Sequence, residues 1–240
     1  MPKPTCLQLK VQLAKIQDLF REFDLALGKV RETKKTEHLM EMQKEIEGKV
    51  EKLQEKFMSK EIREKIQDWQ DFYREVFQME TDFSNIEIPE KQEGFDKLLI
   101  MAPGLDAQKI FDKCKEFFAT SDFDSSTVRD LERATDSAYA VWIRNGVEAD
   151  EENKNLSADK IKEIGMATQT LRERLLQELE HFKKTGMHLD IHNVTLCAGS
   201  RHGDVSVLSV YWRSDDGKLI VYWDNSDNAY NNLRARQVVS

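Results

Sequence analysis

Apolar residues in the first third of the chain recur at alternating intervals of three and four residues, which is the pattern of packed helices. The pattern has three runs, over residues 6–30, 39–57 and 62–76, and the polar segment RETKKTEH separates the first two. Helices with this spacing stabilise one another by burying their apolar faces. We therefore predict an antiparallel helical hairpin or small bundle over residues 1–88. A coiled coil that pairs with a partner chain is the alternative.

The helical pattern ends at TDFSNIEIPEKQEGF, where Pro89 and Gly94 interrupt it and the composition changes. We place a domain boundary here and predict an α+β domain over residues 95–240. Its first part contains two strand candidates, DKLLIMAPG and SAYAVWIRN, both rich in apolar residues. Two helices are predicted, AQKIFDKCKEFF with Asp106 as its cap, and TQTLRERLLQELEHFKKTG, which ends at Gly186.

The last fifty residues have the pattern of a small, mainly antiparallel sheet. VSVLSVYWR and KLIVYWDN flank SDDG, a loop suited to a β-hairpin, and NVTLCAGS is a third strand candidate. Pairing across the loop puts one set of residues on a common, core-facing side: Leu208, Val210, Trp212, Leu219, Val221 and Trp223. The opposite side carries a mixed set: Ser209, Tyr211, Arg213, Lys218, Ile220 and Tyr222.

The charge and the cysteines limit the classes of function. The net charge of −8 gives no overall attraction to nucleic acid or to an anionic membrane. The three cysteines are far apart and form no CxxC pair, which is typical of a reducing compartment and not of a disulfide framework or a structural zinc site. The first residues, MPKPTCLQLK, lack the apolar core of a signal peptide, and no apolar stretch approaches the roughly 18 residues of a membrane span. We expect a soluble, cytoplasmic protein.

Five stretches of the C-terminal part resemble, in order and spacing, a group of bacterial proteins. They are LLIMAPGLDAQKIFDKC, SAYAVWIRN, VEADEENKNLSADKIKE, LRERLLQELEHFKKTGMHLDIHNVTLCAGSR and LRARQVVS. The resemblance covers about residues 97–240 and implies a C-terminal α+β domain that begins near the predicted boundary. No activity, cofactor or partner is known for the group, so the resemblance implies none here. His192 and His202 depart from the group's pattern, which has a carboxylate or amide and an aromatic residue at those positions.

Arginine and tyrosine residues of the C-terminal sheet form the one binding site that we predict. Arg201 follows a Gly-Ser turn, and Arg234 and Arg236 alternate in LRARQ, so they project from one face of an extended segment. Tyr211 and Tyr222 lie on the mixed face of the hairpin. Guanidinium groups beside aromatic rings suit phosphates, carboxylates or stacked bases. The alternative, favoured because surface arginines commonly form ion pairs, is that the arginines pin the chain end through Asp204, Asp215, Asp224 and Asp227.

Two catalytic or metal-binding hypotheses use the stretch from His188 to His202. His188, Asp190 and His192 would share one face of a strand, and imidazole with carboxylate suits zinc, iron or manganese. Cys197 or Ser200, with a histidine as base, would be the nucleophile of a catalytic site. No second cluster completes a metal shell, and a cysteine within a strand is usually buried and inert. We therefore predict no metal, no cofactor and no catalytic residue.

The leading functional hypothesis is a non-enzymatic interaction or scaffold protein that binds a protein partner, or itself, through its N-terminal helices. The second is a binding module for nucleic acid or another anionic ligand that uses Arg201, Arg234 and Arg236. The third is a hydrolase built around His188, Asp190 and Cys197.

Overall fold

The computed structural model describes residues 60–133, 136–203 and 206–240, together with five isolated residues: Arg21, Gln43, Lys44, Ile46 and Gly48. The first two runs of the predicted helical hairpin lie outside the described residues apart from those five. The chain divides into two compact units, Met1–Glu64 and Lys65–Ser240. The second unit contains every site described below.

The third helical run forms α3, Lys60–Phe72, which continues into a π-helical turn, Tyr73–Phe77. The buried aromatic residues Trp69 and Tyr73 attach this element to the first strand of the α+β part. Trp69 Nε1 donates to the Leu98 carbonyl at 2.9 Å, and the Tyr73 hydroxyl donates to the Ile100 carbonyl at 2.7 Å. The end of the predicted helical region therefore packs in the same compact unit as the sheets.

Two sheets confirm the α+β class, and both are mostly antiparallel. The smaller sheet has the order β1-β3-β8, and the larger has the order β2-β4-β5-β6 with β7 added beside β4. The strands of the smaller sheet are β1 (Lys97–Met101), β3 (Tyr139–Ile143) and β8 (Val238–Val239). Those of the larger sheet are β2 (Val128–Asp130), β4 (Val194–His202), β5 (Ser206–Arg213), β6 (Lys218–Asn225) and β7 (Leu233–Ala235).

Strand β4 is the centre of the larger sheet. One of its edges pairs with β5, and the other pairs in parallel with β7 near the start of β4 and antiparallel with β2 near its end. The chain then passes from β7 in the larger sheet to β8 in the smaller one within three residues, so the C-terminal segment joins the two sheets.

The predicted hairpin of β5 and β6 is confirmed. Arg213 pairs with Lys218 across the SDDG loop, and the pairs Leu208–Trp223 and Val210–Val221 lie on one face as expected. Trp223 differs from the prediction, because its side chain is 52% exposed although the pattern assigned it to the core. It lies near the end of the edge strand β6 and stacks on His202, with ring centroids 5.2 Å apart.

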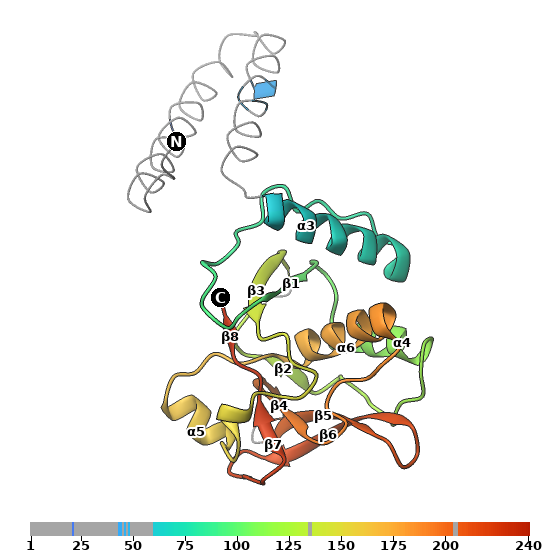
Figure 1. The fold of residues 1–240 in the computed structure, drawn as a ribbon, viewed down its shortest axis with the longest axis vertical. Coiled ribbons are helices and arrows are strands. Elements are labelled where there is room, and N and C mark those ends of the chain that lie inside the picture. The colour runs from blue at the N-terminus through green and yellow to red at the C-terminus, as the bar shows by residue number, and fades with distance from the viewer. Residues whose placement is uncertain are drawn as a thin grey trace. The chain divides into compact units, whose positions relative to one another are not determined.

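Three helices accompany the sheets: α4 (Ala107–Lys115), α5 (Ala158–Glu163) and α6 (Leu171–Thr185). Asp106 caps α4 as predicted, by accepting a hydrogen bond from the Lys109 amide at 2.8 Å. Helix α6 lies beside α4 and contacts β1 of the smaller sheet and both β4 and β5 of the larger one (Figure 1). Gly186, at φ 70°, ends α6 in the left-handed conformation that glycine adopts without strain. None of the helices described has the length and apolar composition that a membrane crossing requires.

Candidate functional site

Helix α6 carries an unusual density of buried charge. Every residue from Leu171 to Glu180 is buried, including two arginines and three glutamates of its polar face. Buried charges are costly unless they are paired. The structure pairs Glu173 with Arg133 and Glu180 with Lys97, and it pairs the two arginines in two clusters centred on Asp190 and Asp130.

The first cluster is centred on the fully buried Asp190. Arg174 Nη2 lies 2.8 Å from one carboxylate oxygen of Asp190, and Arg236 Nη2 lies 2.7 Å from the other. Arg236 also donates to the carbonyls of Gly146 and Val147, at 2.9 Å and 2.8 Å. Burial alone would raise the pKa of Asp190, but the two guanidinium groups outweigh it and hold that pKa below its ordinary value. This cluster ties α6 to the C-terminal segment that joins the two sheets.

The second cluster binds β2 to α6. The Asp130 carboxylate accepts short contacts from Arg172 Nε and from the Ser200 hydroxyl. The Ser200 hydroxyl oxygen in turn accepts the Leu171 amide at 2.9 Å. These contacts fix the inner face of the β2–β4 pair against the start of α6, so the outer face has a defined position.

That outer face carries two arginines side by side. Arg129 of β2 is the register partner of Arg201 of β4, and directly opposed residues of an antiparallel pair project from the same face. The register of β4 with β5 shifts between Cys197 and His202, so Arg201 lies on an irregular part of the strand. Arg201 Nη1 donates to the carbonyls of Ala198 and Ser200, at 2.7 Å and 2.9 Å, which holds its guanidinium close to the strand.

Arg129 and Arg201 line the basic cavity, an open hollow of about 690 Å³ between β2, β4 and α5. Its basic lining residues come from three parts of the chain: Arg129 and Arg133 from β2 and the segment after it, Lys162 from α5, and Arg201 from β4. The remaining lining residues are Leu131, Glu132, Ala158, Ile161, Gly165, Met166, Ala167, Ala198, Gly203 and Ser240. The cavity therefore joins a cationic wall to an apolar floor.

The cations of the basic cavity differ in how their charge is balanced. Arg133 is bound by Glu173, with Arg133 Nη2 at 2.9 Å from Glu173 Oε2, so its charge is largely compensated. Among the described residues, no carboxylate lies within ion-pair distance of Arg201 or Lys162. Burial raises the pKa of Glu132, the one acidic side chain of the lining, and the attraction of Arg133 only partly opposes this. Arg201 and Lys162 are therefore the lining cations that no described carboxylate balances.

Only one of the five predicted site residues lies in this cavity, and it is Arg201. Arg234 forms an ion pair with Glu151 at 2.5 Å, and Arg236 is buried against Asp190. Tyr211 and Tyr222 line a different cleft on the β5–β6 hairpin. The predicted residues are thus divided among four places. Arg234 and Arg236 do form ion pairs, but with Glu151 and Asp190 and not with the aspartates named in the alternative.

The residues of the metal and nucleophile hypotheses have separate contacts and do not form one site. His188 Nδ1 contacts Glu178 Oε1 at 2.8 Å, and its ring stacks on Trp212. Cys197 is completely buried, as expected for an inert thiol, and burial raises its pKa. In the part of the chain that the structure describes, no three His, Cys, Asp or Glu side chains are grouped so that they could hold a metal ion.

Sequence reasoning missed Arg129 and Lys162. Arg129 belongs to a three-residue strand in TVRDLER, a segment without a clear alternation, and its pairing with β4 spans about seventy residues of chain. Lys162 lies in α5, where no element was predicted, although Ser157 followed by an Ala-Asp-Lys-Ile segment is a recognisable N-cap, and Ser157 does cap α5.

Comparison with protein-family models, curated proteins and solved structures finds no match for this chain.

Proposed function

We propose that the chain is a non-enzymatic binding protein whose basic cavity holds a small anionic ligand. One observation carries this proposal: Arg201 and Lys162, neither paired with a described carboxylate, line the same cavity from two separate elements. Arg129, the strand partner of Arg201, also lines the cavity. An anion placed between Arg201 and Lys162 would be attracted by both.

The chemistry of the wall favours a phosphate or carboxylate group. A guanidinium offers several N–H donors in a fixed plane that matches such groups, and charge-assisted hydrogen bonds are about twice as strong as neutral ones. Arg201 uses Nη1 for two backbone carbonyls, which orients the guanidinium and leaves its other nitrogens available to a ligand. Lys162 lies on the exposed side of α5 and can approach as a flexible point charge.

The floor of the basic cavity favours a ligand with an apolar part as well. Ala158, Ile161 and Ala198 belong to a buried apolar cluster and also line the cavity. The volume of about 690 Å³ is within the range of small-molecule sites and exceeds the space that a bare phosphate needs. A small organic phosphate or carboxylate therefore fits better than a nucleic-acid strand, which the overall charge of −8 would repel.

Calorimetric titration of the purified chain with pyrophosphate, at low ionic strength, tests the proposal. Arg201→Gln and Lys162→Gln should each weaken binding about tenfold, because one charge-assisted hydrogen bond contributes roughly 1.5–3 kcal/mol. Lys160→Gln is a matched control: Lys160 lies two residues away on α5, pairs with Glu163 and is not part of the cavity lining.

A variant that is expected to strengthen binding, rather than weaken it, makes the test more specific. Glu132→Gln removes the acidic side chain of the lining and should strengthen pyrophosphate binding. Equal weakening by Lys160→Gln and Lys162→Gln would show that pyrophosphate responds only to overall charge, and the basic cavity would then not be the site.

The predicted protein-binding role of the N-terminal helices, and the likeness of residues 97–240 to bacterial proteins, remain predictions. A binding protein with a ligand-controlled α+β unit and a helical interaction surface is compatible with both. No described residue supports the third hypothesis, since Asp190 is held by two arginines and Cys197 is buried.

A further inference from the structure

The hairpin of β5 and β6 carries a second hollow, the aromatic cleft, of about 410 Å³. Its aromatic lining residues are Tyr211, Tyr222 and Tyr230, together with Trp212, whose ring stacks on His188 and belongs to the other face of the hairpin. Its other lining residues are Ile191, His192, Asn193, Val194, Arg213, Ser209, Ser214, Asp215, Asp224, Asn232 and Leu233. None of these residues lines the basic cavity. The cleft is therefore a separate feature of the larger sheet.

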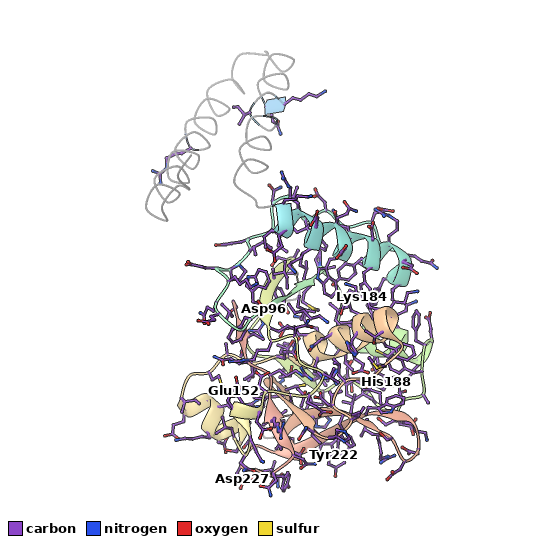
Figure 2. The ribbon with its side chains drawn as sticks, viewed as in Figure 1. Asp96, Glu152, Lys184, His188, Tyr222 and Asp227 are labelled. Atoms are coloured by element: carbon purple, nitrogen blue, oxygen red, sulfur yellow. The ribbon has the colours of Figure 1, made fainter. Side chains whose placement is uncertain are left out.

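Two of the tyrosine rings are open to solvent. Tyr222 is 52% exposed and Tyr230 is 48% exposed. Tyr211 and Tyr222 occupy diagonal positions on one face of the hairpin, because Tyr222 pairs with Ser209, two residues before Tyr211. Tyr222 is labelled in Figure 2, at the outer surface of the larger sheet.

Hydrogen bonds hold the loop that forms the opposite side of the aromatic cleft. Glu148 accepts the backbone amides of His192 and Asn193, at 3.2 Å and 3.0 Å, and the Asn193 side-chain amide at 2.8 Å. Asp224 accepts hydrogen bonds from the Ser209 hydroxyl and the Asn228 side chain, which fixes its carboxylate beside the rings. The cleft is thus a preformed structure with two defined sides.

The charge of the aromatic cleft is opposite to that of the basic cavity. Asp215 and Asp224 are its carboxylates, and Arg213 is its one lysine or arginine. Arg213 is bound through two nitrogens by Asp216, at 2.7 Å and 2.5 Å, so its charge is balanced from outside the lining. Open aromatic faces next to uncompensated carboxylates attract cations, since the faces of the rings are themselves negative.

We propose that the aromatic cleft binds a small organic cation that bears a trialkylammonium group. Such a group is bulky and weakly hydrated, so it does not need a direct ion pair. Proteins recognise it by placing aromatic rings around it. Asp215 and Asp224 supply the net negative charge. The volume of about 410 Å³ favours a free small molecule over a polymer.

Nuclear magnetic resonance titration of the full chain with choline tests the proposal, and 3,3-dimethyl-1-butanol is the neutral molecule of the same shape. Choline should shift the signals of Tyr222 and Tyr230 saturably and bind at least tenfold more tightly than the neutral alcohol. Tyr222→Leu should weaken choline binding about tenfold, whereas Tyr222→Phe, which keeps the ring, should stay within about threefold of the parent.

Charge variants complete the test. Asp215→Asn should weaken choline binding several-fold, and Asp227→Asn, an equal change of charge at an exposed residue outside the lining, should not. Asp227 lies apart from Tyr222 in Figure 2. Equal binding of choline and the neutral alcohol, saturable binding of a neutral sugar but not of choline, or binding only to phosphatidylcholine vesicles would each overturn the proposal. A negative result for choline would not contradict the proposed anion site, because the basic cavity and the aromatic cleft share no lining residue.

Discussion

Asp190 is the residue on which most of the buried charge depends. It accepts hydrogen bonds or ion pairs from Arg174, Arg236 and the Thr195 hydroxyl, and its backbone is left-handed, at φ 53°. Asparagine and aspartate tolerate that conformation better than most residues. Asp190→Asn therefore removes the charge while it keeps the backbone, which makes it a clean test of the cluster.

We predict that Asp190→Asn lowers the free energy of unfolding by about 3–5 kcal/mol, because it leaves two buried guanidinium groups without their shared partner. Denaturant unfolding followed by circular dichroism measures this. Asp227→Asn, at an exposed position, should change the free energy of unfolding by less than about 0.5 kcal/mol. A loss near zero for Asp190→Asn would mean that the cluster does not hold the fold.

The pH dependence of the same variant follows from the lowered pKa of Asp190. The unfolded carboxyl has a pKa near ~3.9, so below that pH the unfolded state takes up the proton first. The stabilisation by Asp190 is complete above about pH 4 and is lost as the pH falls through the lower native pKa. The difference in unfolding free energy between parent and Asp190→Asn should therefore shrink steadily toward pH 2 in a series of denaturant titrations, and a difference independent of pH would contradict this.

The burial and the contacts of single residues were the hardest features to predict from the sequence. Arg201 was identified from its place after an expected Gly-Ser turn, and that turn was wrong, because Gly199 and Ser200 belong to strand β4; Arg201 nevertheless lines a cavity. The alternation in LRARQ could not show that Arg236 would be buried, because its partner Asp190 lies 46 positions earlier and only the fold brings them together. Local spacing describes which way a side chain projects, whereas burial depends on distant elements.

At the scale of elements, patterns of apolar residues predicted most of the structure. The strands β1, β3, β4, β5 and β6 and the helices α4 and α6 lie where the sequence placed them. The short elements β2, β7, β8 and α5 were missed, because two to six residues carry too little periodicity. The sequence of helix α6 shows one apolar stripe, but the polar face of the helix is buried too, since Asp130 and Asp190 supply partners for its arginines.

Gly199 determines how closely β4 approaches the start of α6. A Cβ atom at this position would lie 3.0 Å from the Thr168 carbonyl oxygen and 3.1 Å from Thr170 Cγ2. We predict that Gly199→Ala lowers the free energy of unfolding by about 1–3 kcal/mol, because the backbone oxygen cannot rotate away. Thermal unfolding checks this, and an unchanged melting temperature would show that β4 can move away from α6 without cost.

At the scale of the whole molecule, the start of the α+β unit differs between the sequence pattern and the compact units of the structure. The sequence placed the boundary between residues 88 and 95, yet Trp69 and Tyr73 form hydrogen bonds with β1, and the second compact unit begins at Lys65. The composition change at Pro89 and Gly94 marks a loop, and a loop does not show whether the helix before it packs on the strand after it.

Two shortened chains distinguish these boundaries. A chain of residues 60–240 should unfold cooperatively at nearly the melting temperature of the full protein, because it keeps Trp69 and Tyr73. A chain of residues 95–240 exposes the face of β1 that these rings cover and should melt at a clearly lower temperature or aggregate. Equal stability of the two chains would place the boundary where the sequence pattern put it.

The central claim is that the basic cavity binds an anion, and a titration of the isotope-labelled full chain with pyrophosphate, followed by nuclear magnetic resonance, tests it most directly. We predict saturable shifts of the backbone amide signals of Gly165, Ala198 and Gly203, which line the cavity, while Asn193 and Tyr222 of the aromatic cleft stay unmoved. The Arg201→Gln variant should lose these shifts. Cavity signals that stay unmoved at saturating pyrophosphate, or shifts of equal size over both hollows, would contradict the account.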